Sequence, residues 1–152
     1  MNDITHTLIK ALAWLGAAPF VLAFSADLLY LPLPHAAVDI FALYSLLILC
    51  FLCGSLWGQV IVKGLDRHRT FKLVFSNVIV IAVFLVWLVS DLAHLLPLLA
   101  AGYVLLLYVE VKFQHQGDSD VLATQPYWIL RMQVTTFVVA LHVAYMVFRA
   151  IA

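Results

Sequence analysis

The sequence predicts an all-α integral membrane protein: a bundle of five transmembrane helices with a cytoplasmic N-terminus and a C-terminus outside. Hydrophobic residues make up 66% of the 152 residues and charged residues only 11%, too few polar side chains to cover a water-soluble domain. Five apolar stretches are each about 20 residues or longer, enough to cross a hydrocarbon core of ~30 Å. Basic residues are distributed unequally between the two ends of these stretches, which predicts the orientation.

We expect a single transmembrane domain over residues 1–152, with no second domain, linker or internal repeat. The predicted spans are residues 8–29, 36–62, 71–89, 92–111 and 127–148. In the first span, Pro19 lacks an amide hydrogen and clashes with the preceding turn, so a kink is predicted beside Gly16. Within the second span, the stretch from Ala42 to Val62 has no formal charge. It is the clearest transmembrane helix of the chain.

Helix boundaries follow from capping residues and prolines. Thr70 is the expected N-cap of the third span, and Ser90 with Asp91 is expected to form the turn that caps the fourth. Pro97 lies one or two turns inside the fourth span, and Pro126 is expected to start the fifth. Because the turn between spans three and four is short, these two spans should form an antiparallel hairpin.

Lysine and arginine set the predicted orientation. With five spans, one side of the membrane collects seven of the eight basic residues, and the other side has only Arg149. The seven are Lys10, Lys63, Arg67, Arg69, Lys72, Lys112 and Arg131. The short N-terminus has no Arg-rich amphipathic presequence, so we expect a bacterial inner membrane rather than a mitochondrion. The formal net charge of zero argues against a nucleic-acid partner.

Small residues form a ridge along the second span. Cys50, Gly54 and Gly58 follow one another at intervals of four, which places them on one helix face where another helix can approach closely. We therefore expect other helices to pack on this face, with Gly16 and Pro19 as further packing positions. Cys50 and Cys53 have the spacing of a redox dithiol, but they lie in mid-span, where a thiolate is disfavoured. Packing is the favoured interpretation of the pair.

Polar residues from four spans are predicted to gather in the cytoplasmic half of the membrane. The candidate intramembrane cluster is Gln59, Asn77, Glu110, Arg131, Thr135 and, further out, His142. Glu110 and Arg131 reach the same membrane level from opposite chain directions, so an ion pair between them is expected. One interpretation is a polar clamp that holds the spans together. The alternative is a site for a lipid head group, a quinone or a small anion, with Arg131 as the charge partner.

The fifth span has a polar stripe. Arg131, Thr135, His142 and Arg149 lie close to one helix face, which should point to the bundle interior. For His142 the favoured interpretation is a neutral core histidine hydrogen-bonded to a neighbouring span; a proton relay, or a haem or metal ligand, are the alternatives. No catalytic residues, cofactor or metal are predicted.

The outer ends of the spans carry two pairs of candidate metal ligands. His35 and Asp39 are four residues apart, and Asp91 and His94 are three apart, so each pair lies on one helix face. The simpler interpretation is that Asp39 and Asp91 occupy first turns of helices, where a carboxylate stabilises the free amide groups. A metal site or a proton-collecting site is therefore only a weak candidate.

Three short motifs resemble those of the DUF3429 family of small membrane proteins of unknown function, which includes the mitochondrial transmembrane protein 69 group. They are Leu15–Phe20 in span one, Phe51–Gly58 in span two and Pro126–Arg131 at the start of span five. The family pattern has a glycine at the position of Cys53 and a serine at that of Cys50, which also favours packing over redox chemistry. The resemblance implies a compact helical bundle and no known activity.

These observations leave three classes of function open. The first is a non-enzymatic accessory or assembly factor for an inner-membrane complex, since little of the chain lies outside the bilayer. The second is a small transporter or channel, which with five helices requires a homo-oligomer. The third is a membrane-embedded enzyme or a binder of a lipid or quinone. No phosphate loop, zinc-binding His-Glu helix or serine nucleophile motif is present in the sequence.

Overall fold

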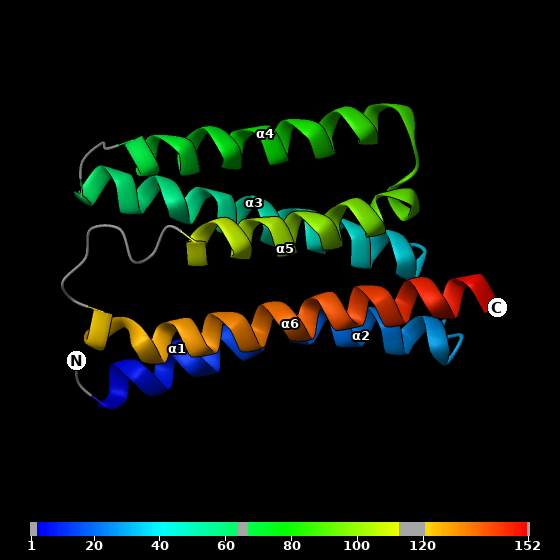
Figure 1. Cartoon of the computed structure of the whole chain (residues 1–152). Helices are drawn as coiled ribbons and strands as arrows, with labels where there is room; N and C mark the ends of the chain where they lie inside the picture. Colours follow the sequence, from blue (N-terminus) through cyan, green and yellow to red (C-terminus); the bar gives the residue numbers. More distant parts are fainter. Residues whose placement is uncertain (1–2, 64–66, 113–120, 152) are drawn as a thin grey trace.

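The structure, a computed structural model, describes residues 3–63, 67–112 and 121–151. Within them the helices are α1 (Asp3–Leu15), α2 (Ala18–Leu28), α3 (Ala37–Lys63), α4 (Arg67–Val89), the 3-10 helix η1 (Leu92–Leu95), α5 (Leu96–Lys112) and α6 (Val121–Ile151). They run side by side along one long axis, with the N-terminus and the C-terminus at opposite ends (Figure 1). The predicted all-α class is confirmed.

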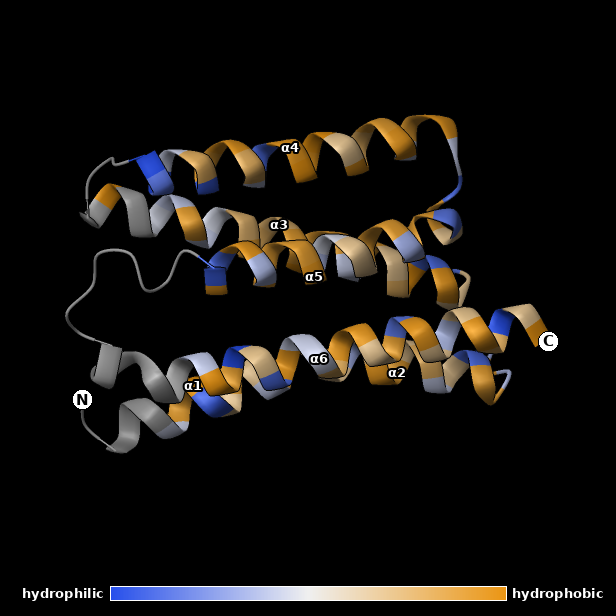
Figure 2. Ribbon diagram, viewed as in Figure 1, coloured by the Kyte–Doolittle hydropathy of each residue, from blue (hydrophilic) through white to orange (hydrophobic). Residues whose placement is uncertain are grey.

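Five helical stretches among the described residues are long and apolar enough to cross a membrane. They are Thr7–Leu28, Ala37–Gly58, Arg67–Val89, Leu92–Lys112 and Trp128–Ile151. Hydrophobic residues cover most of each helix, and hydrophilic ones lie mainly near the helix ends, with a few in the middle of α6 (Figure 2). Large apolar side chains point outward from the bundle, for example Phe51, which is 71% exposed. This surface suggests a lipid environment.

The first span is broken in the middle, as predicted from Pro19. Helix α1 ends at Leu15, and α2 starts at Ala18 with the proline in its first turn. The amide of Gly16 still donates to the carbonyl of Leu12 at 2.9 Å, so the chain bends through a short turn rather than unwinding. Proline is tolerated at this place because the first amides of a helix have no intrahelical acceptor.

Two helix starts differ from the prediction. Helix α4 begins at Arg67, so Thr70 lies in its first turn and is not its N-cap. Helix α6 begins at Val121 and continues through Pro126. Both helices thus begin earlier than the apolar spans that they contain, because the polar residues that precede each span also adopt helical backbone.

The hydrogen bonds of the turn between α4 and η1 differ from the expected capping by Ser90 and Asp91. Asp91 does occupy the N-cap position of η1 with extended backbone, but its side chain makes no capping hydrogen bond. Its backbone carbonyl accepts from the amide of His94 at 3.0 Å, and the hydroxyl of Ser90 donates back to the carbonyl of Val86 at 2.7 Å. Pro97 is the second residue of α5, directly after the 3-10 turn, where no intrahelical donor is lost.

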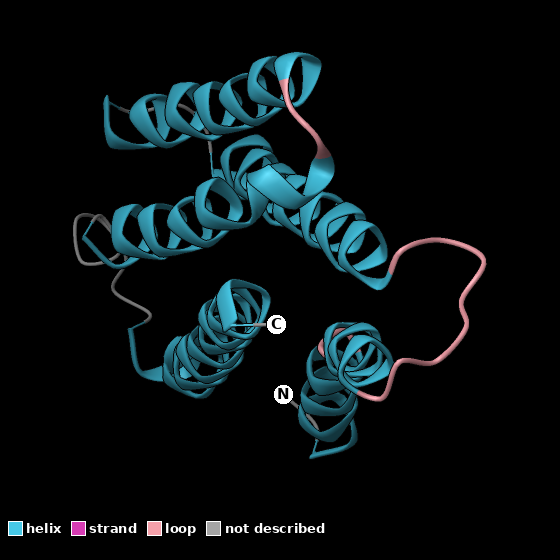
Figure 3. Ribbon diagram, turned by 90° about the vertical axis from the view of Figure 1, so that its right-hand side faces the viewer, coloured by secondary structure: helices cyan, strands magenta, loops and turns pink. Residues whose placement is uncertain are grey.

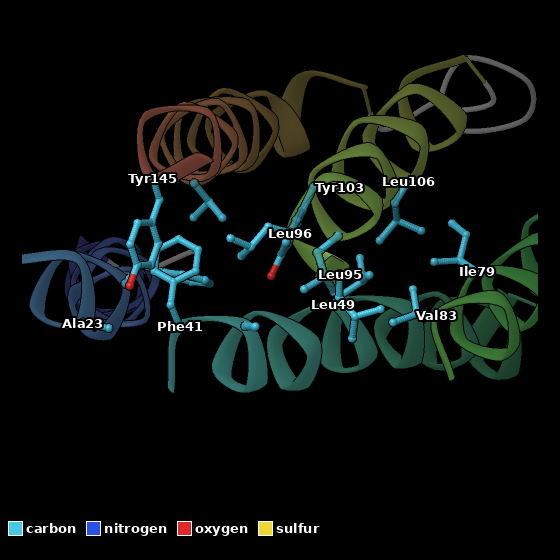
Figure 4. Close-up of a cluster of buried hydrophobic side chains, with 14 of the residues drawn as sticks. Ala23, Phe41, Leu49, Ile79, Val83, Leu95, Leu96, Tyr103, Leu106 and Tyr145 are labelled. Carbon is cyan, nitrogen blue, oxygen red and sulfur yellow. The ribbon is translucent and has the colours of Figure 1, made fainter. Parts of the chain in front are cut away.

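The core lies where α2, α3, α5 and α6 face one another, with α4 and η1 against α3 and α5 (Figures 3 and 4). Fully buried side chains from these helices include Phe20, Phe41, Leu49, Leu95, Leu99 and Tyr145. No Cα atom of α3 lies within 8 Å of one in α6 among the described residues. Only side chains therefore connect α3 and α6. These side chains belong to the polar site described below.

Candidate functional site

Helix α6 carries the polar side chains that connect it to three other helices. The predicted stripe faces the interior over most of its length and reaches the surface at the C-terminal end of α6, where Arg149 is exposed. The contacts are Arg131 with Glu110 of α5, His142 with Ser45 of α3, and Tyr145 and Arg149 with Asp27 of α2.

The predicted ion pair of Arg131 and Glu110 is present. Nε and Nη2 of Arg131 donate to the same carboxylate oxygen, Oε2 of Glu110, at 3.0 and 2.8 Å. The side chain of Glu110 is 2% exposed and that of Arg131 10% exposed. The two charges neutralise each other inside the bundle, and loss of either one would leave an uncompensated buried charge. The pair therefore holds α5 and α6 in one register.

His142 is fully buried and makes the predicted hydrogen bond to a neighbouring helix. Its Nδ1 lies 2.8 Å from the backbone carbonyl of Val138, and its Nε2 lies 2.8 Å from Oγ of Ser45. A carbonyl can only accept, so Nδ1 of the neutral ring carries the hydrogen and Nε2 accepts from the serine hydroxyl. Both ring nitrogens are thus satisfied within the protein, and the bond joins α6 to α3.

Aromatic rings surround the His142 ring. The ring centroids of Phe41, Tyr103 and Phe20 lie 4.8, 5.6 and 5.8 Å from that of His142. The hydroxyl of Tyr103 donates to the backbone carbonyl of Ser45 at 2.9 Å, so α5 is tied to the same level of α3. Figure 4 shows the Tyr103 ring between α5 and α3, in the middle of the core. This enclosure supports a structural, hydrogen-bonded histidine.

The interface between α2 and α6 is also polar near the C-terminal ends of these two helices. The hydroxyl of Tyr145 donates to Oδ2 of Asp27 at 2.8 Å, and Nη1 of Arg149 lies 3.8 Å from the same oxygen. Asp27 is 23% exposed and Arg149 52% exposed, so water or lipid head groups can reach this pair. Arg149, the one basic residue that the sequence assigns to this end of the spans, is the charged partner of Asp27 in the structure.

A cavity of about 230 Å³ lies between the ion pair and the histidine. Its walls come from α1, α2, α3, α5 and α6, and they are almost entirely apolar, with Leu12, Phe51 and Val134 among them. Arg131, Thr135 and Tyr103 contribute the polar side chains of the lining. Arg131 and Thr135 are four residues apart in α6 and therefore share one helix face. The cavity thus has polar side chains on one wall and apolar side chains on the others.

One member of the predicted cluster, Asn77, lies elsewhere, and the side chain of another is not described. Asn77 is exposed, and its Nδ2 donates to the carbonyl of Leu73 in its own helix at 2.8 Å. This local bond satisfies the amide without any other helix, which is why Asn77 does not need to face the interior. Gln59 belongs to α3, but its side chain lies outside the described residues.

The two glycines of the small-residue ridge of α3 face away from the bundle, contrary to the expectation. A Cβ atom added at Gly54 or Gly58 would meet no described atom within 4 Å. Residues on the opposite face of α3, such as Ser45 and Leu49, are buried in the interior instead.

Of the two cysteines, Cys53 is buried and Cys50 half-buried, and both are free thiols. Gly16 lies in the turn between α1 and α2, with room for a Cβ atom.

The candidate metal ligands lie at the surface. His35, Asp91 and His94 are exposed, and Asp39 is half-buried in the first turn of α3. Across the described ranges, no three His, Cys, Asp or Glu side chains come together as a metal site would require. Asp39 lies where a carboxylate favours the free amides of a helix start, as the simpler interpretation expected.

Sequence reasoning missed three residues that build this interior. Ser45 and Tyr103 complete the histidine network, and Gly102 lets α5 approach α3: a Cβ atom there would lie 2.9 Å from Cδ2 of Leu49. A serine in the middle of an apolar span was the available signal for Ser45. Nothing in the sequence distinguishes Gly102 from Gly54, because both are glycines inside apolar helices.

The fold and this interior define a bundle of five apolar helices whose buried charged and histidine side chains are paired within the bundle, which suggests a multi-pass membrane protein. The chain belongs to the DUF3429 family, described as a protein of unknown function, whose sequence model matches residues 5–147. Comparisons with curated proteins and with solved structures gave no match.

Proposed function

We propose that this protein is a non-enzymatic accessory or assembly factor that docks a helix of another inner-membrane protein against α3. One observation carries the proposal: Gly54 and Gly58 lie on the outer face of α3 with no described atom within 4 Å of an added Cβ. Leu47 and Ile61 flank them on the same helix face and are exposed. Together these four residues are termed the α3 outer face.

Physical chemistry favours a helix as the occupant of the α3 outer face. Lipid tails gain little from contact with glycine, whereas a second helix gains close van der Waals contact and weak Cα–H hydrogen bonds across a small-xxx-small surface. The protein's own interior does not use this face. Most of the described chain is helix of membrane-spanning length, so contacts with a partner inside the bilayer are the main means of action open to it.

The proposed membrane is the bacterial inner membrane, with the N-terminus in the cytoplasm. Support comes from the basic residues at the start of α4 and the end of α5, such as Arg67 and Lys112, which share one end of the bundle with the N-terminus (Figure 1). Arg149 lies near the C-terminus at the other end. Under the positive-inside rule the richer end is cytoplasmic. Reporter fusions at the two termini test this orientation.

The hydrogen bonds in the interior of the bundle favour a docking function over transport or catalysis. His142 has both nitrogens bonded and three aromatic rings around it, and Arg131 is paired with Glu110. A transport path would need polar groups that can exchange partners with water or substrate. Paired and enclosed groups are instead typical of a rigid clamp between helices.

The test is purification of the tagged protein in a gentle detergent, with mass spectrometry of the eluate and the native mass of the particle. Wild type should retain a defined membrane partner in a larger complex. The variant Gly54→Leu should lose that partner, because the added side chain fills the contact surface. The matched control Val78→Leu adds bulk at an exposed position of α4 and should retain it. Clean isolation of wild type as a lone particle would contradict the proposal.

A further inference from the structure

The cavity between the ion pair and His142 has an open side. Leu12 of α1 and Phe51 of α3 both line it and are exposed, so they mark a mouth that faces the surroundings of the bundle. Among the described residues, no Cα atom of α1 lies within 8 Å of α3. A ligand can therefore reach the cavity sideways between these two helices, directly from the hydrocarbon layer.

The inner wall of the cavity offers hydrogen-bond donors. Thr135 is 6% exposed, and the described part of the chain gives its hydroxyl no hydrogen-bond partner. No enclosed side-chain oxygen or nitrogen of the described residues lacks a partner, so this hydroxyl is accessible, and Thr135 lines the cavity. Arg131 lines the same wall and uses two of its five N–H donors on Glu110. A buried polar group facing an apolar cavity favours a ligand with a matching acceptor.

Because Arg131 is paired with Glu110, the wall of the cavity favours an uncharged ligand. Glu110 neutralises Arg131 at 2.8 Å, so the wall has donors but no net charge. An anionic head group would have to leave water, and it would lie near the Glu110 carboxylate as well as near the guanidinium. A carbonyl oxygen needs only the donors. The geometry therefore favours a neutral acceptor over a phosphate or a carboxylate.

We propose that this cavity binds the head of an isoprenoid quinone, with one ring carbonyl accepting hydrogen bonds from Thr135 and Arg131. Phe20, Phe51 and Tyr103 line the cavity and present aromatic rings to a flat quinone ring. The volume of about 230 Å³ is below the ~300–1,000 Å³ of drug-sized sites, so it holds one ring and not a pair of acyl chains. The single tail leaves through the mouth between α1 and α3.

The test uses wild type in phosphatidylcholine nanodiscs titrated with the short-chain quinone decylubiquinone, with empty nanodiscs as background. We expect one saturable site per chain. Thr135→Val keeps the shape of the side chain and removes the donor, so binding should weaken about 3- to 10-fold, the effect of one hydrogen bond. The matched control is Thr136→Val, the neighbouring residue on the exposed side of α6, which should bind as wild type does.

A second pair of variants tests the position of the cavity without touching its polar wall. Ala13→Phe fills the cavity from α1 and should weaken binding by more than about 10-fold, whereas Ala11→Phe makes the same change on the exposed side of α1 and should not. Binding that stays equal to wild type in both Thr135→Val and Ala13→Phe would overturn the proposal. Absence of saturable binding to wild type would do the same.

Competition with oleate tests the charge argument. Wild type should prefer decylubiquinone, and Glu110→Gln should shift the preference toward oleate because the Arg131 charge is no longer compensated. Stronger displacement by oleate than by decylubiquinone in wild type would contradict a neutral ligand. None of these results depends on a partner at the α3 outer face, so this site and the proposed function can fail separately.

Discussion

Helices α6 and α3 are both long and apolar, yet they turn opposite kinds of residue toward the bundle. In α6 the inward face is polar: Arg131, Thr135 and His142 are largely or fully buried. In α3 the inward face is mainly apolar with one serine, Ser45, and the small residues Gly54 and Gly58 face outward. The polar residues named above thus lie inside, whereas Gly54 and Gly58 of α3 do not.

The comparison teaches which signal orients a helix when both faces are hydrophobic. A charge or imidazole that faces lipid has no partner, which costs several kcal/mol, so polar residues are driven inward wherever a partner exists. Small residues gain only packing, and either a helix of the same chain or one of another protein can supply it. Charged and histidine side chains in the middle of a span therefore indicate the interior of this chain. Small residues indicate a contact surface but do not identify its partner.

The largest expected effect comes from breaking the inward polar face of α6. Glu110→Leu leaves Arg131 buried and unpaired, which should lower the free energy of unfolding by about 3–5 kcal/mol, whereas the double variant Glu110→Leu with Arg131→Leu should be far closer to wild type. Reversible unfolding in mixed micelles measures both. If the double variant is as unstable as the single one, the pair is not compensating a buried charge.

The second effect compares two glycines under the same substitution. In Gly102→Ala the new Cβ atom would lie 2.9 Å from Cδ2 of Leu49, which is fully buried, so we expect a loss of about 1–2 kcal/mol. In Gly54→Ala nothing described lies within 4 Å, and the isolated protein should gain up to about 1 kcal/mol because alanine favours the helix. Equal effects at both positions in the micelle unfolding measurement would remove the distinction between inner and outer glycines.

A third effect concerns the bond between the two compared helices. Ser45→Ala removes the donor to Nε2 of His142 and should cost about 1 kcal/mol, within the range for hydrogen bonds between membrane helices. In a His142→Phe background the same substitution should cost much less, because the acceptor is already gone. A double-mutant cycle on unfolding measures this coupling. Additive costs would mean that the two side chains do not interact.

The smallest effect is expected at the C-terminal end of α6. Tyr145→Phe removes the hydroxyl that donates to Asp27 at 2.8 Å. Because Asp27 is partly exposed, water can replace the lost donor, and we expect a loss of about 0.5 kcal/mol or less. Thermal unfolding compared with wild type is sufficient to detect it. A loss as large as that of Glu110→Leu would show that this end of α6 is as enclosed as the site of the Arg131–Glu110 pair.

Much of the fold could be predicted because lipid imposes length and composition on each helix. The broken first span followed from Pro19, and the ion pair followed from two opposite charges at the same predicted membrane level. The orientation of the Gly54 and Gly58 ridge could not be predicted, because a small-residue face suits partners inside and outside the chain equally. The cavity also escaped prediction, because it depends on how α1 and α3 are spaced across the bundle.

The central claim, that α3 presents a docking face for another helix, is tested most directly by photocrosslinking in living cells. A benzoylphenylalanine replaces Leu47, which lies on the α3 outer face and is 58% exposed, or Phe84 of α4, which is 51% exposed. We expect a discrete protein adduct from position 47 that disappears in the Gly54→Leu background, and only lipid adducts from position 84. Lipid adducts alone from both positions would contradict the claim.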